Sequence, residues 1–449
     1  MPPLSTPASL PDMVREILLR KGFWAWDRWR GGGVRRHLER LEADFYDPPR
    51  AEAGLRSRVD SLVAHAEKTT AFYRDRKGQG FHELPVVDKP TIKRRVQEFT
   101  STAYDGRALE WVSTSGSSGT PFQVPCTQGK QARRLAEVIY FGGWAGYRVG
   151  MRYAYLSALR QGLFTRLLQN RLQPDLQGTD PGSLERVAVR LSRAGVRAVI
   201  GYPSFISLLA RTLVSGTRLS AGLPLDAVIT MGEGISPVQR RLCRKAFHSN
   251  PLQRYSMNEI GMVAHECPEA GKLHVNVSGV LTEILDSRGQ PVETPGHLGR
   301  LVVSDPDSHA LPLIRYDTGD LGAWGNECSC GCSSPVLNRV EGRRIEEVST
   351  PEGRRVSPFL INNVFRDMDA VVQYQFAQVD EGRYEVRLVV ENGFAGEDRL
   401  RGRLQRVLGP MARLRFRYES AISPLPSGKR PYIVDERSHD RVAGTMGES

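Results

Sequence analysis

Residues 113–121 form a run of hydroxyl residues and glycines with the sequence STSGSSGTP, directly after the stretch 109–112. Glycine lets the backbone approach a ligand closely and adopt positive φ, so such a loop can place several N–H groups and hydroxyls around a polyphosphate. The loop is not a Walker A motif, because Thr120-Pro121-Phe122 stands where Gly-Lys-[Ser/Thr] is required. Taken alone, the segment is also compatible with a flexible linker. We predict a nucleotide site, with these candidate residues: Thr114, Ser115, Gly116, Ser117, Ser118, Gly119 and Thr120.

The size and composition of the chain indicate a globular protein of two or three domains. It has 449 residues, of which 40% are hydrophobic and 25% charged. It contains no run of 18 apolar residues, so no membrane span is expected. Residues 1–7 lack a basic segment followed by an apolar core, so we expect a cytoplasmic protein.

The net charge of +12 comes from basic residues spread over the whole length. A solvated basic surface suits anionic substrates such as ATP or coenzyme A, and nucleic-acid binding is not expected because no aromatic and basic RNA motif is present. The segment from Met13 to Leu41 is both basic and aromatic. Packing of helices explains this segment better than contact with a membrane surface does.

Short apolar runs that alternate with helical patterns predict an α/β fold with a mostly parallel sheet. Helices are expected at Met13–Lys21 and Leu55–Arg76. The runs Val280–Leu285 and Gly299–Ser304, separated by residues 286–289, predict an antiparallel hairpin. The strands expected in the mostly parallel sheet are Tyr153–Leu156, Arg197–Ile200, Ala227–Met231 and Leu252–Tyr255.

A smaller α+β unit is predicted after residue 342. It has expected strands near Val371–Gln378 and Arg383–Val390 and a helix near Asp398–Leu408. We therefore divide the chain into a large N-terminal domain (1–342), a small C-terminal lid domain (343–436) and a disordered tail (437–449).

Four further segments, together with the loop, resemble the motifs of the adenylate-forming superfamily, and they occur in that family's order. They are Tyr255-Ser256-Met257-Asn258-Glu259, Tyr316-Asp317-Thr318-Gly319-Asp320, Gly342-Arg343 and Ser427-Gly428-Lys429. Within the superfamily the chain looks closest to phenylacetate-coenzyme A ligase and its capsule-biosynthesis (CapK-like) and coenzyme F390 synthetase-like relatives. The features that suggest this branch are the segments 84–89 (LPVVDK) and 201–204 (GYPS) and the cysteine pattern.

The resemblance implies a role for each motif. Glu259 would hold Mg²⁺, which prefers carboxylate and phosphate oxygens, and Asp320 would accept hydrogen bonds from the ribose hydroxyls. Tyr255 would offer a flat face to adenine, next to the segment Gly232-Glu233. The loop would cradle the β- and γ-phosphates of ATP, with Asn258 donating to a phosphate oxygen.

Two basic residues complete the predicted catalytic set. Arg343 would contact the ribose or the phosphates. Lys429, in a loop rich in Pro and Gly, would bridge the attacking carboxylate and the α-phosphate. Taken singly, a carboxylate such as Glu259 or Asp320 is more often a salt-bridge partner, and the order of the motifs favours the functional interpretation.

The chain departs from the family pattern at three points. Asn258 stands where threonine is usual, and the loop lacks the lysine that many relatives have after the proline. Residues 344–347 (RIEE) stand where Gly-Arg is normally followed by an Asp pair. The last change falls at the hinge for the rotation of the second step, whereas the carboxylates and the lysine for adenylation are present.

Four cysteines cluster late in the large domain and suggest a structural zinc site. Cys267 and His274, followed by Cys328 and Cys330, offer soft thiolate and imidazole ligands, with Cys332 or His265 as substitutes. Zinc is favoured over disulfides because a cytosolic chain keeps its thiols reduced. A set of free cysteines is the alternative, since the spacing is not that of a standard zinc finger.

The resemblance thus implies an AMP-forming acyl ligase that uses ATP and Mg²⁺ and joins a small-molecule carboxylate to an acceptor, and the cysteine pattern adds structural zinc. Coenzyme A is the acceptor that the resemblance implies. An amine or a hydroxyl, giving an amide or ester in natural-product or polysaccharide biosynthesis, is the first alternative, and transfer of AMP onto a hydroxyl is another variant. A nucleotide-binding protein without turnover is the alternative of a different class. A homodimer is common among the relatives.

Overall fold

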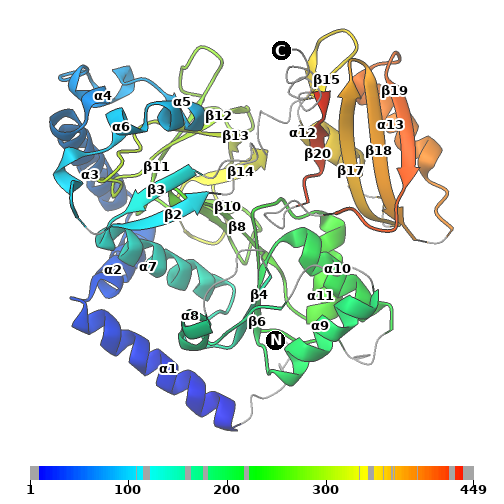
Figure 1. Cartoon of the computed structure of the whole chain (residues 1–449), viewed down its shortest axis with the longest axis horizontal. Helices are drawn as coiled ribbons and strands as arrows, with labels where there is room; N and C mark the ends of the chain where they lie inside the picture. Colours follow the sequence, from blue (N-terminus) through cyan, green and yellow to red (C-terminus); the bar gives the residue numbers. More distant parts are fainter. Residues whose placement is uncertain are drawn as a thin grey trace, which may run out of the picture.

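The computed structural model describes residues 10–437, except for residues 108, 115–121, 157–162, 175–180, 217–221, 333, 342–347, 357, 366–367, 369, 392 and 424–429. Over the described residues the chain is α/β, with one large sheet and a smaller C-terminal α+β region (Figure 1). This is the fold class that the alternation of apolar runs predicts. Among the helices of the described residues, none combines the length and the apolar character that a bilayer crossing needs.

The large sheet has 12 strands in the described part of the chain, and one half of it is parallel. The parallel half runs β8, β7, β6, β4, β5. Figure 1 shows α9, α10 and α11 on one side of this half and α7 and α8 on the other. The strands are β4 (Tyr153–Leu156), β5 (Arg171–Leu172), β6 (Ala198–Gly201), β7 (Ala227–Met231) and β8 (Leu252–Met257), and the helices are α7 (Gln128–Trp144), α8 (Leu163–Leu168), α9 (Pro181–Arg193), α10 (Pro203–Val214) and α11 (Pro237–Phe247).

The two faces of the parallel half pack against different apolar layers. Val199 and Val228 face the core that α9, α10 and α11 complete, whereas Ile200, Ile229 and Met231 belong to the layer on the opposite face. This alternation is what a sheet covered on both sides requires, since successive side chains point to opposite faces. The four strands predicted here are present, and β6 begins and ends one residue later than expected.

The other half of the sheet is antiparallel apart from the short strand β1, which pairs with β13 in parallel. The predicted hairpin is present as β11 and β12, which pair from Leu281 opposite Ser304 to Leu285 opposite Arg300. Its connection is longer than the predicted turn, because the chain turns at 286–290 and then continues to residue 298. The strands are β1 (Val87–Asp88), β9 (Gly261–Glu266), β10 (Leu273–Val275), β11 (Leu281–Leu285), β12 (Gly299–Ser304), β13 (Tyr316–Trp324) and β14 (Val336–Glu341).

The N-terminal helices cover the antiparallel half. The helix expected at Leu55–Arg76 is two helices, because Thr70 is extended (φ −123°, ψ 144°) and its side chain accepts a hydrogen bond from the N–H of Tyr73 as the cap of α4. A separate hairpin, β2 with β3, flanks the loop at 115–121. The elements are α2 (Gly33–Tyr46), α3 (Pro48–Thr69), α4 (Ala71–Arg74), η1 (Phe81–Glu83), α5 (Lys89–Arg94), α6 (Val96–Phe99), η2 (Thr102–Tyr104), β2 (Glu110–Thr114) and β3 (Phe122–Cys126).

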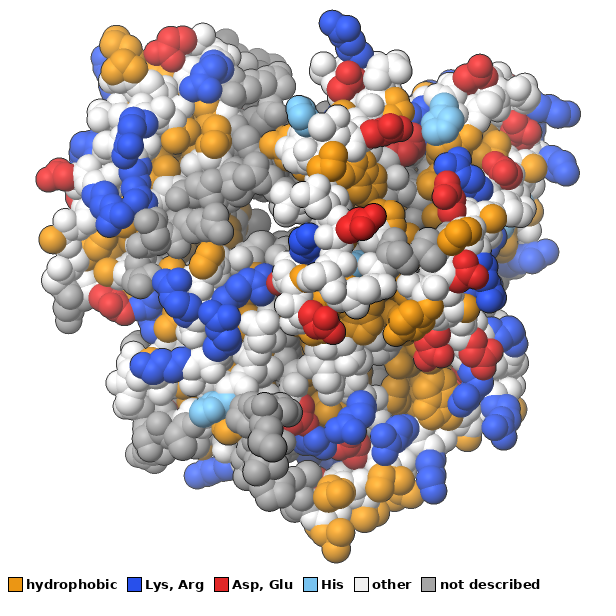
Figure 2. All heavy atoms as spheres, turned by 180° about the vertical axis from the view of Figure 1, so that it is seen from behind, with side chains coloured by type: hydrophobic (Ala, Val, Ile, Leu, Met, Phe, Trp, Pro, Cys, Tyr) orange, Lys and Arg blue, Asp and Glu red, His pale blue; other side chains and the backbone are white. Residues whose placement is uncertain are grey.

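In helix α1 (Leu10–Trp29), Glu16 and Asp27 are buried, and Phe23 and Trp24 pack against the core that α2 and α7 share. Glu16 pairs with Arg197 at 2.9 Å, and Asp27 accepts hydrogen bonds from the N–H groups of Val34 and Arg35. Figure 2 shows hydrophobic and basic side chains together along the lower edge, where this helix lies. The prediction of helix packing therefore holds for one face of α1, and these large apolar side chains of the helix remain exposed: Leu10, Met13, Val14, Ile17, Leu18, Trp26 and Trp29.

The C-terminal region has its own four-stranded sheet, in the order β19, β18, β17, β20, and its own apolar core. The predicted strands and helix are present, and β19, which pairs in parallel with β18, was not predicted. Two hydrogen bonds join this region to the elements around the large sheet. The N–H of Arg430 donates to Glu233, which follows β7, and the hydroxyl of Tyr432 accepts from Gln239 on α11. The elements are β15 (Val348–Ser349), β16 (Arg355–Val356), α12 (Pro358–Val364), β17 (Val371–Asp380), β18 (Arg383–Val390), α13 (Glu397–Leu408), β19 (Arg413–Tyr418) and β20 (Ile433–Asp435).

Candidate active site

Two of the predicted motifs meet between β8 and β13. The hydroxyl of Tyr255, on β8, donates to Oδ2 of Asp320, on β13, at 2.6 Å. Burial, together with the negative charge of Asp320, raises the pKa of Tyr255 above its ordinary value, so the hydroxyl stays a donor. Residues 65 positions apart in the sequence are thus joined by a charge-assisted hydrogen bond.

Glu259 follows β8 and its carboxylate is held from two directions. It is 5% exposed, and its Oε1 accepts a hydrogen bond from the hydroxyl of Tyr316 at 2.9 Å. The same oxygen lies 3.7 Å from Nζ of Lys89. Lys89 reaches this position because β1 pairs in parallel with β13, with Val87 opposite Tyr316. A buried carboxylate of fixed orientation is a suitable ligand for a divalent cation.

Asn258 connects this turn to the predicted phosphate loop. Its Nδ2 donates to the carbonyl oxygen of Ser113 at 2.9 Å, and Ser113 lies in β2 one residue before its end. Thr114 ends β2. The loop residues 115–120 lie outside the described residues, so the contact places the start of the loop beside the turn.

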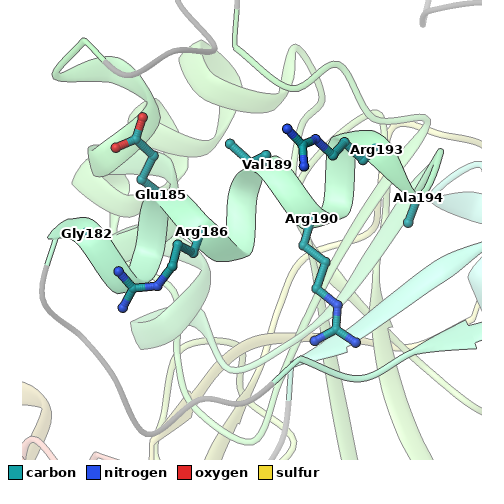
Figure 3. A pocket seen from close by; sticks show the side chains of 7 residues that line it. All are labelled: Gly182, Glu185, Arg186, Val189, Arg190, Arg193 and Ala194. Atoms are coloured by element: carbon teal, nitrogen blue, oxygen red, sulfur yellow. The ribbon is translucent and has the colours of Figure 1, made fainter.

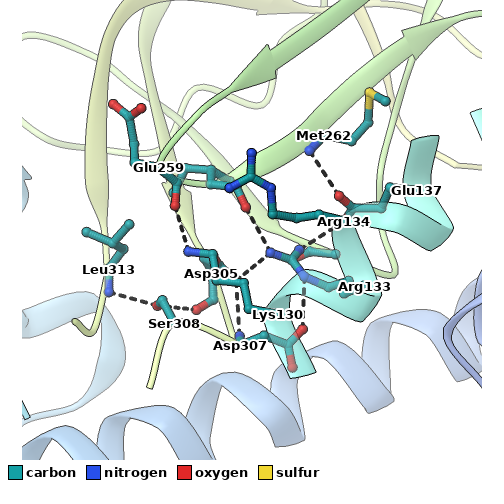
Figure 4. Close-up of polar contacts among 12 residues, drawn as sticks. Lys130, Arg133, Arg134, Glu137, Glu259, Met262, Asp305, Asp307, Ser308 and Leu313 are labelled. Carbon is teal, nitrogen blue, oxygen red and sulfur yellow. Dashed lines mark hydrogen bonds and ion pairs between the residues drawn. The ribbon is translucent and has the colours of Figure 1, made fainter. Parts of the chain in front are cut away.

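Three basic side chains of α7 hold the backbone of the turn at 258–260 (Figure 4). Arg134 Nη1 donates to the carbonyl oxygen of residue 258 at 2.8 Å, Lys130 Nζ to that of residue 259 at 2.6 Å and Arg133 Nη2 to that of residue 260 at 2.9 Å. Residues at i, i+3 and i+4 share one face of a helix, which explains how α7 reaches three consecutive carbonyls. These residues position Glu259 and were not predicted from the sequence, although their spacing of i, i+3 and i+4 indicates one face of a helix.

A buried charge network supports α7 in turn. Asp305 accepts from Lys130 at 2.7 Å and from Arg133 at 3.0 Å, and Arg133 also pairs with Glu137 at 3.0 Å. Glu137 accepts from the N–H of Met262 at 3.1 Å. Gly261 is required beside it, because its φ is +120° and an added Cβ would lie 2.9 Å from Glu137 Oε2.

Glu233, predicted to line the nucleotide base, lies where the C-terminal region meets the large sheet. Its carboxylate accepts from the N–H and the hydroxyl of Ser204 at 3.1 Å each and from the N–H of Arg430 at 3.1 Å. Lys429 itself lies outside the described residues, as do Arg343 and Gly342. Arg430, the residue after the predicted lysine in the sequence, therefore lies in the same region of the molecule as Glu233. Gly232 follows β7 with φ +75°.

Three cysteines and a histidine come together beside β9 and β10: Cys267 follows β9, His274 lies in β10, and Cys328 and Cys330 lie in the connection between β13 and β14. The possible ligand atoms of Cys267, His274, Cys328 and Cys330 all lie within 4.8 Å of one another. His274 Nδ1 lies 3.3 Å from the carbonyl oxygen of Ser334, which leaves Nε2 directed at Cys330 Sγ, 3.3 Å away.

The two substitute ligands lie apart from this group. The thiol of Cys332 contacts the carbonyl oxygen of Phe45 at 3.9 Å. His265 lies against the rings of Phe141 and Trp144, and its Nδ1 is 3.1 Å from the carbonyl oxygen of Glu266. The structure therefore brings together the four residues of the predicted set without needing a substitute.

One pocket lies away from all these residues. It has a volume of about 670 Å³ and lies against the outer face of α9, where Arg186, Arg190 and Arg193 line it (Figure 3). It contains none of the predicted nucleotide residues. We place the candidate active site by the convergence of the motifs, because that convergence involves the residue types that bind nucleotide and metal.

The overall architecture is that of known adenylate-forming enzymes. The chain aligns with the crystal structure of 2-hydroxyisobutyryl-CoA ligase in its postadenylation state at a TM-score of 0.69, with 17% identity, over 89% of this chain and 94% of that one. The chain has the adenylate-forming fold. A second structure with this fold, an anthranilate CoA ligase in complex with anthranoyl-AMP, aligns at a TM-score of 0.51 with 13% identity, over 74% of this chain and 66% of that one.

Sequence comparisons agree with the adenylate-forming fold and with the predicted resemblance. Residues 348–436 match the CapK C-terminal domain family. A phenylacetate-coenzyme A ligase of Thermus thermophilus is 27% identical over 359 residues, which cover 74% of this chain and 80% of that protein. The resemblance to the branch of phenylacetate-coenzyme A ligase and CapK-like proteins is thus confirmed.

Proposed function

We propose that the protein is an ATP-dependent, AMP-forming acyl ligase that transfers the acyl group to coenzyme A. The observation that carries the proposal is that Tyr255 contacts Asp320 and that Tyr316 contacts Glu259. These two contacts join β8 and the turn after it to β13, and so bring together a carboxylate for a cation and a carboxylate for ribose. The similarity to a phenylacetate-coenzyme A ligase and the adenylate-forming fold support it.

The proposed reaction has two steps, adenylation and transfer of the acyl group. A carboxylate oxygen of the acid attacks the α-phosphorus of ATP, and pyrophosphate leaves. The thiol of coenzyme A then loses its proton to solvent, its sulfur attacks the carbonyl carbon of the acyl-AMP to form the thioester, and AMP leaves. Bringing two anions together in the first step requires fixed positive charge and N–H donors.

Residues of the candidate active site are assigned to these requirements. Mg²⁺ bound to Glu259 would neutralise charge on the phosphates of ATP. Asp320 would orient the ribose. Lys429 would bridge the attacking carboxylate and the α-phosphate, and Arg343 would contact the ribose or the phosphates. Lys130, Arg133 and Arg134 fix the backbone that carries Glu259 and act as positioning residues.

Replacing Lys429 tests the first step. We expect wild-type protein with Mg-ATP to release pyrophosphate and to form a hydroxamate with hydroxylamine for one class within a panel of aryl, fatty, amino and sugar acids. We expect Lys429→Ala to slow pyrophosphate release by about 100-fold or more, because a cation at the developing charge is lost. Lys245→Ala, an exposed lysine on α11, is the matched control.

The outcomes separate the competing functions. Undiminished release in Lys429→Ala would disprove the role of this lysine. Product with an added amine, without consumption of coenzyme A thiol, would identify an amide-forming ligase instead. Binding of ATP without turnover of any acid would favour a nucleotide-binding protein.

The cluster of Cys267, His274, Cys328 and Cys330 is assigned to a structural Zn²⁺. Three thiolates and one imidazole form a closed ligand set for tetrahedral zinc, and the contact of His274 Nδ1 with a carbonyl is the usual orienting partner of a zinc-bound histidine. The site would tie β9 and β10 to the turn before β14, the strand that leads to the segment at 342–347.

Metal analysis tests the zinc site. We expect about one zinc per chain after purification without chelator, and a large loss of zinc in Cys330→Ser with a lower melting temperature. Cys332→Ser, which removes a neighbouring thiol outside the group, should keep its zinc. Less than about half an equivalent in the wild type, or equal zinc in both variants, would contradict the assignment.

A further inference from the structure

Two largely buried arginines lie on the same face of the parallel half of the sheet. Arg171 on β5 stands opposite Tyr153 on β4, and Arg254 on β8 stands opposite Met231 on β7. Tyr153 and Met231 both belong to the apolar layer on the face that α9, α10 and α11 do not cover. Paired residues on neighbouring strands point to the same face, so both arginines extend over this layer.

The arginines are the two ends of a continuous row of side chains. Arg254 Nη2 lies 3.0 Å from the sulfur of Met231, and that sulfur lies 3.6 Å from the hydroxyl oxygen of Tyr155. The guanidinium carbon of Arg171 lies 3.8 Å from the centre of the Tyr155 ring. The row therefore has a cation at each end and an apolar and aromatic middle.

Both guanidinium groups have hydrogen-bonding capacity that the described residues do not use. The Nε of Arg171 and that of Arg254 are buried without a hydrogen-bond partner, and neither side chain forms an ion pair with a carboxylate of the described residues. The thioether of Met231 is a weak acceptor. Burial lowers the pKa of Arg254, and the positive charge of Arg134 acts in the same direction. Buried cations without anionic partners are costly, which favours the binding of an anion.

The row lies beside the candidate active site at the carboxyl end of β7. The side chain of Arg254 points to the opposite face of β8 from that of Tyr255, whereas Met231 ends β7 and directly precedes Gly232-Glu233. Ligands of parallel sheets bind outside the carboxyl ends of the strands. Arg254 and Tyr155 are partly exposed, so a ligand can reach them. An acid whose reacting carboxylate lies at the nucleotide residues can therefore extend its other end along this row.

We infer that Arg254 and Arg171 bind a second anionic group of the substrate, so that the acid is a dicarboxylate or another carboxylic acid with an anionic tail. Met231 and Tyr155 lie between the two guanidinium groups. The inference rests on the proposed acyl ligase function and narrows its substrate class. A monoanionic acid such as phenylacetate would leave both guanidinium groups without a charged partner.

Matched pairs of acids test the inference. The series is the straight-chain dicarboxylates from succinate to sebacate, each with its monomethyl ester, and 4-carboxyphenylacetate with phenylacetate. We expect at least one dianion to exceed its uncharged-tail partner by about 30-fold in kcat/KM for adenylation, which corresponds to about 2 kcal/mol. Arg254→Met and Arg171→Met should bring this ratio near one, and Arg254→Lys should keep part of it. Arg190→Met, an exposed arginine on α9, should leave the ratio unchanged.

A binding measurement separates failure of the inference from failure of the proposed function. The preferred dianion should raise the melting temperature of the wild type more than its half ester does, and this difference should vanish in Arg254→Met. Turnover of the monoanionic acids with ratios near one in wild type and variants would overturn the inference and leave adenylation standing. A dianion that shifts the melting temperature without any turnover would support the anion site and count against the ligase. Equal shifts from dianion and half ester would overturn the site itself.

Discussion

Glu259→Gln is expected to lower the rate of acyl-AMP formation by about 1000-fold, with little change in folding stability. The amide keeps the size of the side chain, and its oxygen can still accept the hydrogen bond that Tyr316 donates at 2.9 Å. The negative charge that would hold Mg²⁺ is removed. Because a charge is lost and a hydrogen bond is kept, the effect should fall on catalysis.

Single-turnover release of pyrophosphate at several Mg²⁺ concentrations measures this effect. The variant should need a higher Mg²⁺ concentration for its residual activity, since one ligand of the ion is weakened. Glu293→Gln, an exposed glutamate in the connection between β11 and β12, is the matched control and should behave like the wild type. A rate within tenfold of the wild type at every Mg²⁺ concentration would contradict the assignment of Glu259 to the metal.

The strands and motifs were predictable because their signals are local. The runs at β4 and β7 have the expected bounds, and the segments around Glu259 and Asp320 carry recognisable residue orders. Such patterns depend on neighbouring residues alone. The meeting of these two segments followed from the resemblance to a known family rather than from the residue pattern.

The residues that support Glu259 could not be predicted because they depend on pairings distant in the sequence. Lys89 reaches Glu259 only through the parallel pairing of β1 with β13. The face of α7 with Lys130, Arg133 and Arg134 reads in the sequence as an ordinary solvated basic face. The fold turns this face toward three carbonyl groups and two buried carboxylates.

The row formed by Arg254, Met231, Tyr155 and Arg171 could not be predicted for the same reason. Arg171 and Arg254 are separated by three intervening strands in the sheet, and nothing in the local sequence marks them as neighbours of one apolar layer. A sequence pattern also gives no measure of whether a guanidinium has a partner. The sequence alone therefore does not indicate the substrate class. The register of β5 and β8 does bear on it, because it places both arginines over one apolar layer.

Arg133→Met is expected to have the largest effect on stability, with a loss of about 3–5 kcal/mol in the free energy of unfolding. Arg133 is 2% exposed and pairs with Glu137 and Asp305, so the substitution leaves buried carboxylates with less positive charge around them. Urea unfolding followed by tryptophan fluorescence measures the loss. Arg134→Met, which removes one partly exposed hydrogen bond to a carbonyl oxygen, is the matched control and should cost about 1 kcal/mol.

The deficit of Arg133→Met should also depend on pH, in a direction that identifies its cause. Burial raises the pKa of Glu137 in the folded wild type, and Arg133 opposes that rise. Without the arginine the folded-state pKa of Glu137 lies further above its unfolded value, so the folded variant binds more protons than the unfolded chain does. Its stability then falls as pH increases through that range. The difference from the wild type should therefore be smaller at pH 5 than at pH 8, whereas a deficit caused by lost packing would be the same at both.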